Sequence, residues 1–122
     1  MLESGEIDYH SLARLVDFHL QNGTDGLVIM GTTGEAATIP FAEQLKVLSF
    51  VIEHVAGRCQ ILAGNGSNST AEAVEKTLQL NQFAIDGYLT VTPYYNKPTQ
   101  KGMIAHFKAV AEAAAKPVLL YN

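Results

Sequence analysis

Four short apolar runs recur along the chain at similar intervals, and this repetition limits the possible folds more than any other feature. Each run has the length of a strand. None shows the polar/apolar alternation of a strand with one solvated face, so we expect strands that are covered on both faces. The runs are Leu27 to Met30, Ile61 to Ala63, Tyr88 to Val91 and Val118 to Tyr121.

Amphipathic helical patterns separate these runs. Pro40 suits a first helical turn, Gly57 suits a helix end, and Ser69 with Glu72 has the spacing of a capping box. The predicted order is a helix, three strand–helix units and a final strand. Each predicted helix has one apolar stripe, and the stripes comprise Leu12, Leu15, Val16 and His19; Phe41, Leu45, Leu48, Ile52 and Val55; Val74, Thr77 and Leu78; and Ile104, Phe107 and Ala111.

Strands that start about thirty residues apart predict parallel βαβ crossovers. Such units build either an open doubly wound sheet or a (β/α)8 barrel, and the spacing does not choose between them. A complete barrel needs roughly 250 residues, so as a barrel the 122-residue chain would be a single partial domain spanning residues 1–122. An isolated half-barrel would expose strand edges and an apolar sheet face, so we expect further chain or a partner.

Composition and charge argue against several classes of protein. The net charge is −4 and the eight basic residues are scattered, so no basic stripe can neutralise phosphates. No stretch approaches the ~20 apolar residues that a bilayer requires, and the first residues do not resemble a signal peptide. We therefore predict a cytoplasmic protein with neither a nucleic-acid nor a membrane partner. The lone Cys59 begins an apolar run, which favours a reduced, buried thiol.

Polar residues follow the carboxyl end of every apolar run. After the first run, the glycines of Gly31-Thr32-Thr33-Gly34-Glu35 permit a tight turn whose amides and hydroxyls suit a small carboxylate. Taken singly, each cluster also fits an ordinary loop. A parallel sheet brings all of them to one rim, where α/β enzymes place their sites. The other clusters are Ala63 to Thr70, Pro93-Tyr94-Tyr95-Asn96-Lys97-Pro98 and Tyr121-Asn122.

In order and spacing, these motifs resemble the dihydrodipicolinate synthase family over essentially the whole chain. The resemblance implies a (β/α)8 barrel, of which this chain covers about half, from the first helix to the fifth strand. It also implies a class I aldolase that joins pyruvate to a lysine as an imine and condenses the enamine with aspartate semialdehyde, on the path to diaminopimelate and lysine. No cofactor and no metal are implied.

The resemblance also assigns roles to individual residues. Thr32 and Thr33 would hold the pyruvate carboxylate through backbone amides. Thr32, Tyr95 and Tyr121 would relay protons as the catalytic residues, which suits hydroxyls because each donates and accepts at once. Tyr95 would reach the site of a neighbouring subunit, so a homodimer or homotetramer is expected.

A regulatory site is implied by the same resemblance. Asn68, Glu72 and Tyr94 match the site where family members that are inhibited by lysine bind this effector. Histidines are frequent on the helix that follows the glycine–threonine turn in such members, and the corresponding residues here are Phe41 and Gln44. This difference weakens the expectation of feedback inhibition.

The resemblance places essential parts outside these residues. The family pattern would begin with a strand before Met1 and continue after Asn122 through an arginine to the imine-forming lysine. We expect none of the six lysines present to replace it, because an imine-forming amine needs desolvation or cationic neighbours. Four lie in predicted helices, one in a loop and one at the amino end of a strand; they are Lys46, Lys76, Lys101, Lys108, Lys97 and Lys116. The histidines are expected at the surface or in packing rather than as metal ligands: His10, His19, His54 and His106.

Two alternatives remain open. One is another pyruvate-dependent aldolase, such as an N-acetylneuraminate lyase or a keto-deoxy-sugar aldolase. The other is a non-catalytic fragment. The run Asn96-Lys97-Pro98-Thr99 favours the synthase, and the residues that follow Asn122 would discriminate between the two aldolases.

Overall fold

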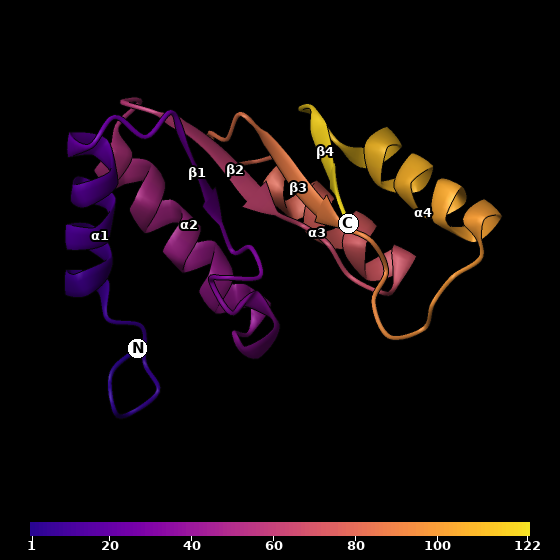
Figure 1. The fold of residues 1–122 in the computed structure, drawn as a ribbon, viewed down its shortest axis with the longest axis horizontal. Helices are drawn as coiled ribbons and strands as arrows, with labels where there is room; N and C mark the ends of the chain where they lie inside the picture. The colour runs from indigo at the N-terminus through magenta and orange to yellow at the C-terminus, as the bar shows by residue number, and fades with distance from the viewer.

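Helices and strands alternate throughout the computed structural model, which describes all residues 1–122 (Figure 1). The predicted order is confirmed. The helices are α1 (Tyr9–Gln21), α2 (Phe41–Val55), α3 (Thr70–Leu80) and α4 (Gln100–Ala113), with a 3-10 turn, η1 (Ala36–Thr38), before α2. The strands are β1 (Gly26–Ile29), β2 (Gln60–Gly64), β3 (Gly87–Val91) and β4 (Val118–Tyr121).

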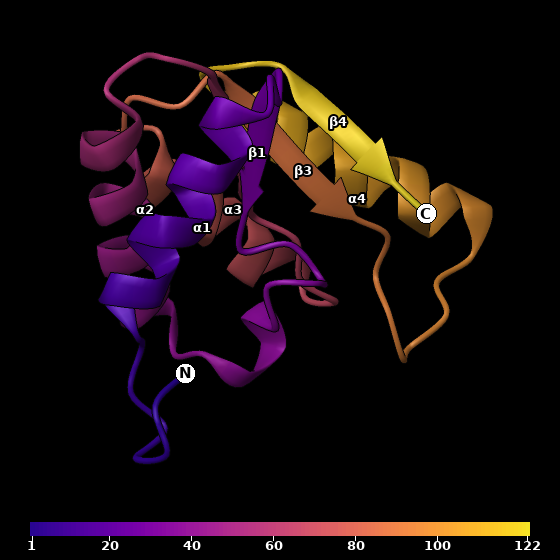
Figure 2. The ribbon, with the colours of Figure 1, turned by 60° about the vertical axis from the view of Figure 1, so that its left-hand side comes forward.

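The four strands form one parallel sheet in the order β1-β2-β3-β4. Doubly wound sheets reverse their strand order at a switch point, and this sheet has no reversal. Right-handed crossovers between successive neighbours place the connecting helices on the same face of the sheet, and α4 lies behind β4 in Figure 2. The topology is that of a (β/α)8 barrel.

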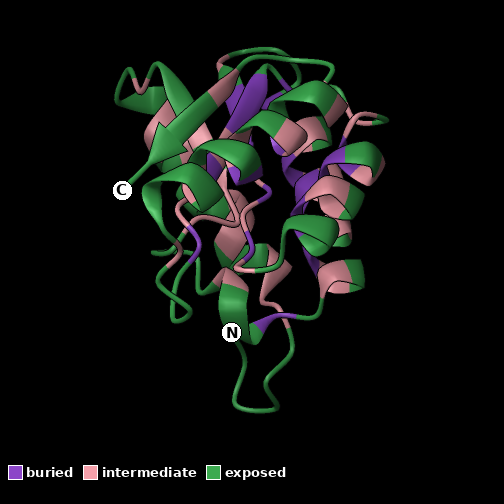
Figure 3. Cartoon of the chain, turned by 90° about the vertical axis from the view of Figure 1, so that its right-hand side faces the viewer, coloured by how far each residue is buried: buried purple, intermediate pink, exposed green.

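The two faces of the sheet differ in burial, and β4, which leads to the C-terminus, is mostly exposed (Figure 3). The helix-facing residues Ile61, Ala63 and Tyr88 are buried in the core. On the opposite face Val28 and Leu119 are each 46% exposed. This exposure agrees with the expectation that half of a barrel leaves one apolar sheet face uncovered. The helices cover one face, and in a complete barrel the other face is covered by side chains from the facing strands.

The helices bury different stripes from those predicted at several positions. In α4, Ile104 and Ala111 are exposed, whereas His106 and Val110 are buried. Leu15 of α1 is exposed as well. A polar residue such as His106 can take a core position because its ring Nδ1 lies 2.9 Å from the Thr70 hydroxyl. Leu78 of α3 is likewise exposed.

Local chemistry explains where the elements begin and end. The side chains of Asp8, Ser69 and Thr99 accept hydrogen bonds from backbone amides in the first turns of α1, α3 and α4. β1 ends at Ile29 rather than at the predicted Met30, because Met30 has a left-handed φ of 59° that a strand cannot accommodate.

Cys59 is a free thiol that is partly rather than fully buried. No helix is long and apolar enough to span a lipid bilayer.

His106 makes the stability of the α3–α4 pair sensitive to pH. Burial lowers the pKa of its imidazole below the usual 6.5, and its Nε2 is buried without a hydrogen-bond partner. Below that usual pKa the unfolded state therefore binds a proton that the folded state resists. We expect urea denaturation to show stability falling as pH decreases below about 6.5, with a smaller fall in His106→Gln. His10→Gln, at an exposed position of α1, is the control and should keep the wild-type slope.

Candidate functional site at the carboxyl end of the sheet

A cavity of about 420 Å³ opens at the carboxyl ends of the strands. Its walls come from the turn after β1, the loops after β2 and β3, helices α2 and α3, and the end of β4. The polar residues that line it are Thr32, Glu35, Gln44, Lys76, Tyr94, Tyr121 and Asn122. The predicted convergence on one rim is thus observed, because each of the four clusters contributes at least one residue to the cavity.

The glycine–threonine turn is closed by its own backbone. The Gly34 amide donates to the Gly31 carbonyl at 3.1 Å, and the Glu35 amide donates to the Thr32 carbonyl at 3.0 Å. Glu35 adopts a left-handed φ of 53°. Thr32 lines the cavity, whereas Thr33 lines a separate hollow beside α1. The two threonines are adjacent but contribute to different surfaces.

Two glycines let neighbouring strand ends come together at the floor of the cavity. A Cβ atom at Gly64 would overlap the Met30 carbonyl oxygen. A Cβ atom at Gly66 would lie 2.5 Å from the Cγ1 atom of Val91. Both glycines line the cavity. Because they have no side chains, the neighbouring backbone can approach closely and form the floor of the cavity.

A buried polar network holds the loop after β2. Asn65 is fully buried; its Nδ2 donates to the Thr77 hydroxyl at 2.9 Å, and its Oδ1 accepts from the Thr90 hydroxyl at 2.6 Å. The Thr77 hydroxyl in turn donates to the Ala73 carbonyl at 2.6 Å. Sequence reasoning gave Asn65 no role of its own. The structure shows that it ties β2, α3 and β3 together beneath the cavity.

The tyrosines divide between the cavity and the solvent. Tyr121 and Tyr94 line the cavity, and the Tyr121 carbonyl accepts from the Thr92 amide at 2.9 Å. Tyr95 is 93% exposed, has a left-handed φ of 70° and does not line the cavity. Within this chain, Thr32 and Tyr121 therefore share one cavity, and Tyr95 points elsewhere.

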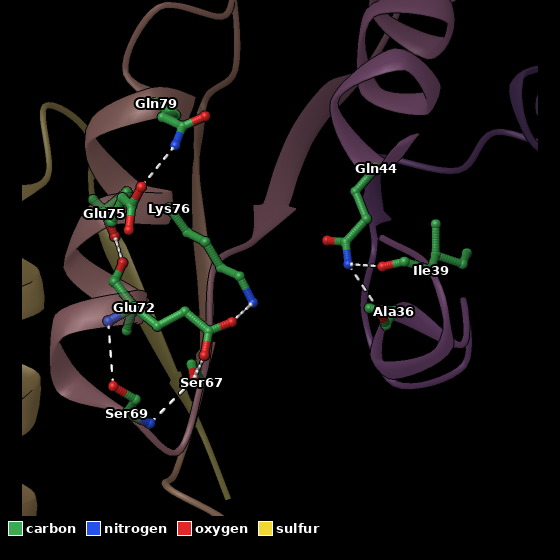
Figure 4. Close-up of polar contacts among 11 residues, drawn as sticks. Ala36, Ile39, Gln44, Ser67, Ser69, Glu72, Glu75, Lys76 and Gln79 are labelled. Carbon is green, nitrogen blue, oxygen red and sulfur yellow. Dashed lines mark hydrogen bonds and ion pairs between the residues drawn. The ribbon is translucent and has the colours of Figure 1, made fainter. Parts of the chain in front are cut away.

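An ion pair on α3 contributes a residue that sequence reasoning missed (Figure 4). Lys76 lines the cavity, and its Nζ lies 2.7 Å from Glu72 Oε1. The Ser67 hydroxyl donates to the other oxygen, Glu72 Oε2, at 2.8 Å. Hydrogen bonds from Lys76 and then Ser67 lower the pKa of Glu72. The signal in the sequence was the Glu-to-Lys spacing of four residues, which pairs side chains on one helix face.

The third residue matched to an effector site, Asn68, does not line the cavity. Its carbonyl accepts from Asn96 Nδ2 at 3.1 Å, which joins the loops after β2 and β3. Gln44 lies across the cavity from α3, and its Nε2 donates to the carbonyls of Ala36 and Ile39, each at 2.8 Å (Figure 4). Glu72 does not line the cavity itself but pairs with Lys76, which does. Tyr94 lines the cavity directly.

Comparison with known proteins decides the family. The model of the dihydrodipicolinate synthetase family matches residues 1–122. The chain belongs to this family. It is 56% identical over its whole length to a 4-hydroxy-tetrahydrodipicolinate synthase from Pseudoalteromonas atlantica, of which it covers 42%. The chain thus spans less than half the length of the curated relatives that it matches.

Solved structures of family members superpose closely. The chloride-inhibited dihydrodipicolinate synthase from Acinetobacter baumannii, determined with pyruvate, matches with a TM-score of 0.97 and 47% identity over 100% of this chain and 42% of its own. The enzyme from Cyanidioschyzon merolae, determined with lysine bound, matches with a TM-score of 0.94 and 45% identity over 99% of this chain and 41% of its own. The four-stranded sheet is about half of the barrel of this family.

Replacing Gly64 tests the close contact at the floor of the cavity. Gly64→Ala must displace the Met30 carbonyl, so we expect the free energy of unfolding to fall by roughly 1–3 kcal/mol, measured by urea denaturation. Gly102→Ala is a matched control, because a Cβ there would come no closer than 3.4 Å to a neighbouring atom and alanine favours the helix interior. Equal loss of stability in both variants would contradict the assigned contact.

Proposed function

We propose that these residues form the pyruvate side of the active site in a class I aldolase that condenses pyruvate with aspartate semialdehyde, in the pathway to diaminopimelate and lysine. The observation that carries the proposal is the shared cavity of Thr32 and Tyr121 at the carboxyl end of a half-barrel. Relatives 50–56% identical over the whole chain carry the name of the synthase, and a solved relative was determined with pyruvate. These names favour the synthase over other pyruvate-dependent aldolases.

The proposed substrate contacts follow from the chemistry of the turn. The backbone amides of Thr32, which lines the cavity, and of Thr33, which lines the hollow that shares Met30 and Glu35 with it, would donate to the pyruvate carboxylate. The hydroxyls of Thr32 and Tyr121 would pass protons during imine formation, because a hydroxyl accepts one proton while it donates another. An imine is itself an electron sink for the neighbouring carbon, so this chemistry calls for neither a metal nor an organic cofactor.

The proposed nucleophile is a lysine in the part of the family barrel that this chain does not cover. Among the lysines present, Lys76 lines the cavity, but its amine is bound to the Glu72 carboxylate at 2.7 Å. Attack on a ketone requires an accessible amine lone pair, and the Glu72 carboxylate occupies this amine. Residues 1–122 would then be a partial barrel domain without the imine-forming group.

Assembly of subunits would complete the proton relay. Tyr95 is almost fully exposed and sits in a backbone conformation that few non-glycine residues adopt. We propose that its ring enters the site of a second copy in a homodimer or homotetramer. A cytoplasmic location fits this biosynthetic role.

Glu72, Tyr94 and Asn68 are proposed to belong to an effector site for lysine. Support comes from the Cyanidioschyzon merolae relative, whose structure was determined with lysine bound. In this chain the Glu72 carboxylate is the group suited to bind an ammonium, and it pairs with Lys76, which lines the same cavity as Tyr94.

The proposed relay predicts losses of activity at three positions. In the full-length protein, we expect Thr32→Val, Tyr121→Phe and Tyr95→Phe each to lower kcat by roughly 100-fold or more, because each removes one hydroxyl that transfers a proton. Condensation of pyruvate with aspartate semialdehyde is the measurement. The control is Tyr9→Phe, which removes a hydroxyl that bonds Glu43 on the α1–α2 surface and should leave kcat near wild type.

The absence of a nucleophile from residues 1–122 can be tested chemically. We expect the polypeptide 1–122, incubated with pyruvate and borohydride, to keep its mass, because its cavity lysine is ion-paired. The full-length Pseudoalteromonas atlantica relative should gain a reduced pyruvyl adduct under the same conditions. An adduct on Lys76 would show that the nucleophile is wrongly assigned.

A further inference from the structure

The cavity already contains an ammonium group that belongs to the chain. Lys76 has a side chain only 16% exposed, although lysine is usually a surface residue. Its Nζ lies 2.7 Å from Glu72 Oε1 and 5.5 Å from the centre of the Phe41 ring. A carboxylate and an aromatic face are the two kinds of group that bind an ammonium most favourably.

The partners of Lys76 are held in place by other contacts. Glu72 is fixed at its second oxygen by the Ser67 hydroxyl at 2.8 Å, and Ser67 is buried. Its first oxygen is directed at Lys76 (Figure 4). Phe41 is the first residue of α2 and packs against the core. The cluster is therefore a formed ammonium site whose occupant is tethered to α3.

We propose that Lys76 is a built-in occupant of the ammonium subsite in this cavity and competes there with a free amine such as lysine. The inference rests on the proposed function, since it takes Glu72 and Tyr94 as parts of an effector site. A free lysine would need the Glu72 oxygen that Lys76 now holds, and two ammonium groups beside one carboxylate repel each other. The side chain thus acts against the free ligand by occupying its charge partner.

The tether keeps the competing ammonium beside the carboxylate. A group attached by a short chain has an effective concentration in the millimolar range at its site, and Glu72 lies one helical turn before Lys76, in the favourable orientation for such a pair. Free lysine must outcompete this local ammonium. The protein should consequently respond weakly to lysine, and the cause is one residue of α3.

Calorimetric titration of the full-length protein with L-lysine tests the proposal. Lys76→Met keeps most of the apolar stem and removes the charge, so we expect its Kd for lysine to be at least about twofold lower than that of the wild type. The methionine side chain could itself fill the space that the ammonium leaves. Lys76→Ala removes this side chain as well and should show the same direction of change. The double variant Lys76→Met/Glu72→Gln should lose the gain, because the carboxylate that binds the ammonium is gone.

Lys46→Met is the matched control. Lys46 pairs with Glu43 at 2.8 Å on the exposed face of α2 and does not line the cavity, so its loss should leave both lysine binding and basal activity unchanged. Wild-type affinity for lysine in both Lys76 variants would overturn the proposal, as would tight binding that survives Glu72→Gln. Failure of the proposed function would appear separately, as a wild-type protein that does not condense pyruvate with aspartate semialdehyde.

Discussion

Parallel pairing of the strands in sequence order is the constraint on which the cavity depends. It sends every strand in the same direction, so that the segments after β1, β2 and β3 and the end of β4 meet at one rim. The pairing is close at this end because Gly64 admits the Met30 carbonyl and Gly66 admits Val91. Larger side chains at these glycines would separate the strand ends and change the walls that Thr32 and Tyr121 provide.

The same sheet has one uncovered apolar face, which is the face that the rest of a larger barrel would cover. Its helix-facing side is packed, while Val28 and Leu119 remain about half exposed on the other side. An apolar sheet face of this kind is stable when facing strands cover it. The relatives that match this chain are more than twice its length, and their structures superpose on it throughout. The packing and the comparisons therefore lead to the same architecture.

Residues proposed for substrate binding and residues proposed for regulation line one cavity in this half of the barrel. Thr32, Tyr121, Lys76 and Tyr94 all line it. Asn65 connects the strands beneath it through its bonds to Thr77 and Thr90.

The sequence by itself determined the order of elements, the parallel sheet and most of the rim, because these follow from apolar periodicity and from polar residues at strand ends. It did not determine which helix face is buried: His106 lies inside and Ile104 outside, since a hydrogen bond to a distant residue offsets the cost of burying a polar ring. Nor did it place Lys76 in the cavity. The spacing from Glu72 indicates a pair on one helix face, but only the packing of α3 against the neighbouring elements decides that this face turns toward the site.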